Sequence, residues 1–246
     1  MFKPLSWQTT GWILALLTVA VSALFMLFPQ LDIATSALFF DPLRGFDAAY
    51  PETFHIIRMT LYYGVVLVGL VSLALFLRSL AIGARRRVPL RVWGFVVTTF
   101  LAGPLILTNS ILKSFWGRAR PLQIEAFGGS RHFSLPWVIS DQCDLNCSFV
   151  SGEGSALAAV ILVAAILVWP NTRGLWRGVL AFVLLPLGVF GIALRVIVGA
   201  HFLSDSLLAV LLMALVTWAF YGLFDMRHYR HDLTWTNLRK DLSKQG

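Results

Sequence analysis

The sequence predicts an all-α membrane protein, a bundle of six transmembrane helices that forms a single domain over residues 1–246. Of its 246 residues, 58% are apolar and only 13% are charged, whereas soluble domains are about 45–50% apolar and about 25% charged. A soluble globule of this size buries only about 70% of the surface that its unfolded chain exposes, so it could not hide this much apolar surface. These observations exclude a water-soluble enzyme, a disordered chain and a small disulfide scaffold.

Six apolar stretches come close to the length that a helix needs to cross a bilayer, which is about 20 residues. They cover roughly residues 12–28, 61–77, 92–112, 153–169, 179–198 and 203–224, and a polar tail follows over residues 225–246. Only helices and closed barrels satisfy their backbone hydrogen bonds in lipid. The stretches are continuously apolar and lack the alternation of barrel strands, which indicates helices.

The basic residues of the connecting segments predict the orientation of the bundle. Thirteen of the 20 Lys and Arg residues fall on one side: Lys3, Arg78, Arg85, Arg86, Arg87, Arg91, Arg173, Arg177, Arg227, Arg230, Arg239, Lys240 and Lys244. The positive-inside rule places that side in the cytoplasm, together with both termini. The net charge of +8 is therefore mainly a topology signal, and we expect no nucleic-acid partner.

The only two cysteines, Cys143 and Cys147, lie four residues apart in the loop after the third stretch, on the predicted external side. An oxidising compartment favours a local disulfide between them. Free thiols are an alternative. A metal site is another, although it needs more ligands than two thiols, and we expect neither a metal nor an organic cofactor.

Two groups of polar residues mark the external ends of the third and fourth stretches. Lys113, Arg118 and Arg120 oppose the positive-inside trend; together they suit a tetrahedral anion, although snorkelling to lipid headgroups is the alternative. Ser151 and Gly152 open the fourth stretch, where small residues expose backbone N–H groups to an anion or simply cap the helix. An acidic residue, Glu153, follows them at the mouth of an apolar run.

A third group lies at the external end of the fifth and sixth stretches. Arg195 is followed by His201 and Asp205, and the last two are four residues apart, so on a helix they share a face. An aspartate that holds one imidazole nitrogen leaves the other nitrogen to act as a nucleophile or a base.

In order and spacing the three groups resemble the signature of the type 2 phosphatidic acid phosphatase superfamily, which is Lys-x6-Arg-Pro, then Pro-Ser-Gly-His, then Ser-Arg-x5-His-x3-Asp. The matching positions are Lys113, Arg120, Pro121, Ser151, Gly152, Arg195, His201 and Asp205. The resemblance implies a metal-independent lipid phosphatase in which His201 forms a phosphohistidine, oriented by Asp205. Lys113, Arg120, Arg195, Ser151 and the Gly152 N–H would hold the phosphoryl oxygens.

The sequence departs from this signature at three positions. Val150 replaces Pro, Leu194 replaces Ser, and Glu153 replaces the first His, which in the family is assigned the role of general acid. We favour a protonated Glu153 as the replacement acid. The alternatives are an ionised Glu153 that orients His201, water or a cation, a substrate whose leaving group needs no acid, and His132 as a substitute acid.

The Ser-Gly-Glu variant with a two-cysteine loop looks most like bacterial lipid A phosphatases of the inner membrane, with the active site facing the periplasm. Arg118 and Arg131 are basic residues beyond the signature, and two interpretations are open for them: contact with a second anionic group, as on a bisphosphorylated glycolipid, or contact with lipid headgroups. Other candidates in the family are an undecaprenyl diphosphate phosphatase, a phosphatidylglycerophosphate phosphatase and a lipid phosphotransferase. Candidates from other classes are a catalytically inactive lipid-binding protein and a small transporter, since intramembrane charges also mark permeation paths.

Overall fold

Six helices of the computed structural model, which describes residues 6–49 and 51–243, are long and apolar enough to cross a membrane. This confirms the predicted helical bundle. The spans are α1 (Trp7–Leu27), α3 (Glu52–Ala81), a third span over Leu90–Phe115, a fourth over Gly152–Asn171, α7 (Leu175–Ile197) and α8 (Leu203–Leu223). The third span joins α4 (Leu90–Phe100), the π-helix η3 (Leu101–Leu112) and α5 (Lys113–Phe115). The fourth joins α6 (Gly152–Leu167) and η6 (Trp169–Asn171).

The second span is the one whose length hydropathy underestimates most. The apolar stretch covers residues 61–77, but α3 has 30 residues and continues past the polar positions at both of its ends. Helix formation does not stop where apolar composition stops, because long polar side chains such as arginine are also good helix formers. Arg58 is therefore a helical residue, held at a fixed position near one end of the bundle.

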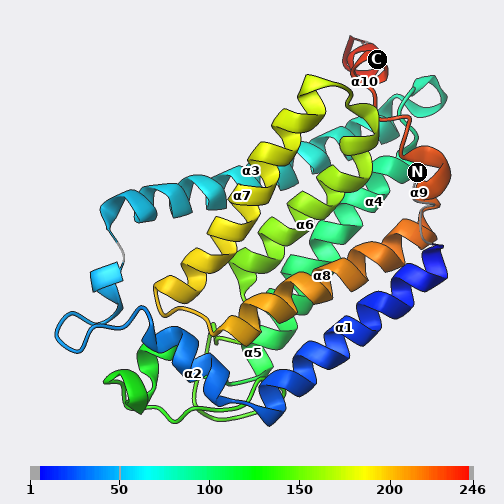
Figure 1. Cartoon of the computed structure of the whole chain (residues 1–246). Coiled ribbons are helices and arrows are strands. Elements are labelled where there is room, and N and C mark those ends of the chain that lie inside the picture. Colours follow the sequence, from blue (N-terminus) through cyan, green and yellow to red (C-terminus); the bar gives the residue numbers. More distant parts are fainter. Residues whose placement is uncertain (1–5, 50, 244–246) are drawn as a thin grey trace.

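The basic connecting segments gather at one end of the bundle, as the sequence predicts. The α3–α4 and α6–α7 connections lie at this end, together with the start of α1 and the end of α8 (Figure 1). Lys3 and Lys244, which were counted with this group, lie outside the described residues.

The segment expected to be a simple polar tail folds back onto this basic end. It contains α9 (Met226–Tyr229) and α10 (Trp235–Ser243). The Asp241 carboxylate accepts hydrogen bonds from the backbone N–H groups of Arg87 (2.6 Å) and Val88 (2.9 Å). The guanidinium of Arg78 donates to the Asp241 carbonyl. These bonds attach α10 to the α3–α4 connection.

The helices approach closely at small residues and leave apolar side chains on the outside. A Cβ atom on Gly11 of α1 would lie 2.3 Å from the ring of Trp218 in α8, and Trp7 stacks on the same ring with centroids 4.5 Å apart. Small residues let neighbouring membrane helices pack in this way. Large outward-facing side chains such as Trp12 and Phe182, which are 71% and 80% exposed, face the hydrocarbon that the predicted bilayer supplies.

The opposite end of the bundle is covered by a cap of short helices and loops (Figure 1). The cap contains α2 (Gln30–Ala37), η1 (Phe46–Ala49), η4 (Pro121–Gln123), η5 (Glu125–Phe127) and the loop that leads to α6. A buried apolar cluster of Phe46, Ala119, Ile124, Phe127 and Phe202 holds these elements together. The cap brings the Lys113–Pro121 segment against the loop between α7 and α8, and this contact positions the site.

Candidate active site

The three sequence groups converge on one cavity of about 560 Å³ at the capped end of the bundle. Its polar lining comes from α3, the end of the third span, the following loop, α6 and the α7–α8 corner: Arg58, Asn109, Lys113, Arg120, Asn146, Glu153, Arg195 and His201. Gly152 contributes backbone to the wall. Lys113 and His201, which are 88 positions apart, therefore share a cavity, as the signature requires.

A tight turn after α7 places His201 beside Arg195. The backbone N–H groups of Ala200 and His201 both donate to the Arg195 carbonyl, at 3.1 and 3.0 Å. Gly199 has a φ of +63°, and a Cβ atom there would lie 2.5 Å from the ring of Phe46. Only glycine meets both conditions without strain. The chain therefore turns within one residue and points the imidazole back towards the cavity.

The imidazole of His201 is fixed by a backbone carbonyl, not by Asp205. Its Nδ1 lies 2.7 Å from the Ser148 oxygen and 4.0 Å from the Asp205 carboxylate. A carbonyl oxygen only accepts, so Nδ1 carries the proton and Nε2 keeps its lone pair. Burial, and then the charges of Lys113, Arg195 and Arg120, lower the pKa of His201 well below its usual value. Near neutral pH the imidazole is therefore uncharged and able to act as a nucleophile.

Asp205 acts on His201 through Ser148, which corrects the expectation of direct contact. The Oδ2 atom of Asp205 accepts the Ser148 hydroxyl and the Phe202 N–H, the latter at 3.0 Å. The same carboxylate group receives the Arg118 guanidinium through Oδ1. Asp205 thus holds the residue that holds the imidazole, and it is a positioning residue in this structure.

Arg118, considered as a substrate contact, is fully buried and does not line the cavity. Its guanidinium donates to Asp32 and Asp205, to the Ser204 hydroxyl and to the Ser134 carbonyl. The Phe202 ring lies 4.4 Å from its central carbon. A side chain with these partners has no access to a ligand, so the prediction for Arg118 is wrong. Asp32 on α2, which the sequence analysis did not consider, is the second carboxylate of this network.

Glu153 is held between two guanidinium groups in the cavity. Its Oε1 accepts from Arg58 Nη2 at 2.7 Å and its Oε2 from Arg58 Nε at 3.0 Å, while Arg195 Nη1 lies 3.4 Å from Oε2. A carboxylate that accepts from two cations is kept ionised. The structure thus contradicts the protonated acid and supports the alternative in which Glu153 orients a cation.

Arg58 was missed by sequence reasoning, although a signal for it existed. It precedes an apolar stretch on the predicted external side, where basic residues are disfavoured. The same criterion singled out Lys113. Arg58 escaped it because the stretch was taken to begin at residue 61, which left Arg58 in a loop instead of on the wall of the cavity.

Ser151 and Gly152 have different environments in the structure. The Ser151 side chain is buried and its hydroxyl accepts the Gly154 N–H at 3.2 Å, so it caps α6. It is absent from the cavity lining, whereas Gly152 belongs to it. A Cβ atom on Gly152 would lie 2.8 Å from Asn109 Oδ1. Glycine therefore allows the start of α6 to approach η3, and the helix N-terminus is favourable for an anion there.

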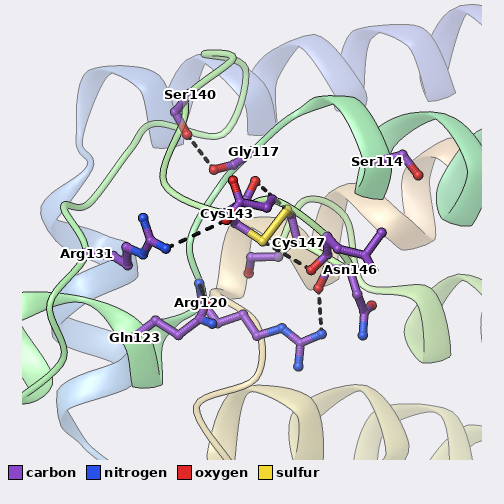
Figure 2. Close-up of a disulfide and its surroundings, with 12 residues drawn as sticks. Ser114, Gly117, Arg120, Gln123, Arg131, Ser140, Cys143, Asn146 and Cys147 are labelled. Atoms are coloured by element: carbon purple, nitrogen blue, oxygen red, sulfur yellow. Dashed lines mark hydrogen bonds and ion pairs between the residues drawn. A yellow bond between two sulfur atoms is a disulfide. The ribbon is translucent and has the colours of Figure 1, made fainter.

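The predicted disulfide between Cys143 and Cys147 is present and lies against Arg120 (Figure 2). Within the five-residue loop that it closes, the Asn146 carbonyl accepts from the Arg120 guanidinium at 2.8 Å. The Cys147 N–H donates to the Lys113 carbonyl at 3.2 Å. The disulfide thus restrains a loop that accepts a hydrogen bond from the Arg120 side chain and donates one to the Lys113 backbone.

Two further candidates, Arg131 and His132, remain outside the cavity lining. Arg131 lies on the cap with its guanidinium 3.8 Å from Asp144, and its side chain is 46% exposed (Figure 2). His132, considered as a substitute acid, is 71% exposed and pairs with Glu125 at 3.1 Å. Neither residue lines the cavity that contains the imidazole of His201.

Curated proteins of known activity resemble most of the chain. The lipid A 4'-phosphatases of Rhizobium leguminosarum and Rhizobium etli (strain ATCC 51251) are each 31% identical to it, over 86% of this chain and 94% and 86% of the respective relative. The lipid A 4'-phosphatase of Francisella tularensis subsp. novicida (strain U112) is 28% identical, over 81% of this chain and 88% of the relative. No solved structure shows significant similarity to the chain.

A family model covers the part of the chain that supplies the signature. The model of the PAP2 superfamily matches residues 91–229, from the start of the third span to the end of α9. This range contains all three motif groups and more than half of the 246 residues. The convergent cavity, the ordered motifs and this match together establish that the chain belongs to the PAP2 superfamily.

Proposed function

We propose that the protein removes the 4'-phosphate of lipid A by transferring it to Nε2 of His201 and then to water. The observation that carries this proposal is the two-part character of the cavity. At the capped end, the lining has four cations and one carboxylate, and the resulting excess of positive charge suits a phosphomonoester dianion.

The rest of the cavity wall is apolar and extends into the predicted membrane. It is formed by side chains of α3, α4, η3, α6 and α7, among them Leu61, Val65, Phe100, Leu105 and Leu157. From Lys113 to Phe100 the third span covers roughly 15–20 Å at helical rise, about the depth of one leaflet of a hydrocarbon core roughly 30 Å thick. A ligand with a phosphate at one end and a hydrocarbon chain at the other matches this lining.

The first step of the proposed reaction transfers the phosphoryl group. Nε2 of His201 attacks phosphorus, the N–P bond forms, and the bond from phosphorus to the sugar oxygen breaks with its electron pair on that oxygen. Lys113, Arg120 and Arg195 hold the three peripheral oxygens, where charge is spread in such transition states. In the second step, water gives a proton to the sugar oxygen and its hydroxide to phosphorus, and the N–P bond returns its electrons to Nε2.

The site is proposed to face the periplasm from the bacterial inner membrane, with both termini in the cytoplasm. The basic segments at the far end of the bundle support this orientation through the positive-inside rule. The disulfide at the capped end supports an oxidising compartment. Arg131, half exposed on the cap, is the residue that we expect near the second phosphate of the lipid.

The test is phosphate release from lipid A by the purified full-length protein in detergent, with mass spectrometry to identify the phosphate lost. We expect release of the 4'-phosphate, its loss in His201→Ala, and an acid-labile phosphoprotein when the reaction is quenched with base. Arg44→Gln, which changes an exposed cation of the cap outside the cavity lining, is the matched control. Release that survives His201→Ala, or the absence of release from lipid A, would overturn the proposal.

A further inference from the structure

The Arg58–Glu153 pair differs from the other charges of the cavity in where it lies and what it contacts. Arg58 comes from α3, outside the three motif groups, and presents its Nε and Nη2 atoms to the two oxygens of Glu153. This is the forked two-point geometry that fixes both position and orientation of a guanidinium. Both side chains line the cavity and are partly exposed to it, at 31% and 25%.

The pair adds a fourth cation to the cavity and is joined to the motif residues, since Oε2 of Glu153 lies 3.4 Å from Nη1 of Arg195. The charges that act most strongly to lower the pKa of His201, after burial, are Lys113, Arg195 and Arg120. Arg58 is not among them, whereas it contributes, after burial, to lowering the pKa of Arg120. The cavity therefore has three cations that belong to the motifs, Lys113, Arg120 and Arg195, and one further cation, Arg58, which Glu153 links to Arg195.

Phosphoryl transfer needs positive charge on the side opposite the nucleophile. The attacking and leaving oxygens or nitrogens are roughly in line through phosphorus, so the bond that breaks points away from His201. Charge develops on the departing oxygen, and a fixed cation there stabilises it without a proton transfer. An ionised Glu153 has no proton to give, but it holds Arg58 in the cavity, and Arg58 is the lining cation that remains once Lys113, Arg120 and Arg195 hold the three peripheral oxygens.

We propose that Arg58 is a catalytic residue that stabilises the leaving sugar oxygen, and that Glu153 is the positioning residue that orients it. This inference rests on the proposed function, because it assigns a role at the same site. The leaving oxygen departs as an ion stabilised by Arg58 and takes its proton from water, whose hydroxide then attacks the phosphohistidine. No side chain serves as general acid in this scheme, so the loss of the family histidine is compensated by charge.

The first experiment compares leaving groups in Arg58→Gln, Arg58→Lys and the control Arg44→Gln. The substrates are lipid A, an alkyl phosphate and an aryl phosphate whose phenol is a good leaving group. We expect Arg58→Gln to lose about 10²–10³-fold in kcat on the first two substrates, as loss of one charge-stabilising donor does, and less than tenfold on the aryl phosphate. Arg58→Lys should recover part of the loss. An equal loss on all three substrates would overturn the proposal.

The second experiment measures the positioning role of Glu153. In Glu153→Gln, kcat on the alkyl phosphate should fall, and adding Arg58→Gln should cause little further loss because the two residues act as a unit. The alkaline limb of the pH profile should be unchanged by Glu153→Gln. A limb that disappears in this variant would identify Glu153 as a proton donor and overturn the proposal.

The two proposals fail in different ways. If lipid A is not a substrate but the alkyl and aryl phosphates are hydrolysed through His201, the proposed substrate is wrong and the leaving-group comparison still decides the role of Arg58. If lipid A is hydrolysed through His201 and Arg58→Gln acts equally on all leaving groups, the proposed function stands and the role of Arg58 is wrong. Thermal unfolding of each variant shows that it is folded.

Discussion

Replacing Arg118 by methionine should unfold the cap at a much lower temperature, because it leaves two buried carboxylates without a cation. Arg118, Asp32 and Asp205 each have 0% exposed side chains, and the guanidinium donates to four different residues. Removing one partner of a buried ion pair costs about 3–5 kcal/mol. Two carboxylates depend on this one cation, which places the cost at the upper end, about 5 kcal/mol.

The magnitude is measurable as a shift in Tm of the purified protein in detergent. For chains of 150–250 residues, 1 kcal/mol corresponds to about 2–4 °C, so Arg118→Met should lower Tm by about 10–20 °C. Arg118→Lys, which keeps the charge but loses the fork, should fall between this variant and wild type. Arg44→Gln, on an exposed residue of the cap, should leave Tm unchanged.

The loss of stability in Arg118→Met should also depend on pH and should be smaller at low pH. Burial raises the pKa of Asp32, and the nearby Arg118 opposes that rise. Without the arginine the pKa rises further, so the folded state gains from protonation and loses stability as the pH rises through that pKa. The Tm gap between wild type and Arg118→Met should therefore narrow when the pH is lowered from about 8 to about 5. A fall in Tm in Arg118→Met that is no larger than in Arg44→Gln, or a Tm difference from wild type that is the same at both ends of this pH range, would refute the reasoning.

Four further predictions concern the cavity and its loop. Because the pKa of His201 is lowered below its ordinary 6.5, protonation of the imidazole should reduce kcat/KM only below that pH. If kcat/KM already falls to half of its maximum at pH 6.5 or above on the acid side, the imidazole is not a buried neutral group. Lys113→Met should reduce kcat by about 10²–10³-fold without lowering Tm, because it removes a positive charge that is repelled by Arg120 and Arg195. A large fall in Tm would show that Lys113 stabilises the fold. Reduction of the Cys143–Cys147 bridge should lower the free energy of unfolding by about 2 kcal/mol, the value for so short a loop. It should also raise KM, because Arg120 donates a hydrogen bond to Asn146 in that loop. An unchanged KM would show that the loop does not contribute to substrate binding. Gly191→Leu adds a side chain to the apolar part of the cavity wall, where even a Cβ atom would lie 2.5 Å from Leu157. Turnover of a long-chain lipid phosphate should therefore fall while that of a water-soluble aryl phosphate is retained. Equal losses on the two substrates would contradict an acyl-chain site.

The amino-acid sequence was sufficient for the membrane architecture and for the convergence of the site. Apolar stretches of bilayer length must be helices, and the side on which basic residues gather separates the two ends of the bundle. The resemblance of the three groups to the family signature then implied that Lys113, Arg120 and Arg195 surround His201, and these four residues line one cavity. The two cysteines lie four residues apart in one loop, which predicted a local disulfide, and the structure contains it.

The partners of the individual charged groups were decided only by the tertiary structure. Arg58 and Glu153 are 95 residues apart, and Arg118 reaches Asp32 and Asp205 over 86 and 87 residues. No local spacing encodes such pairs, because they depend on how the helices rotate and cross. Because of the same packing, Nδ1 of His201 donates its hydrogen bond to the Ser148 carbonyl instead of to Asp205. Buried charges must find a partner, but which partner they find is settled by the packing of segments that are distant in sequence.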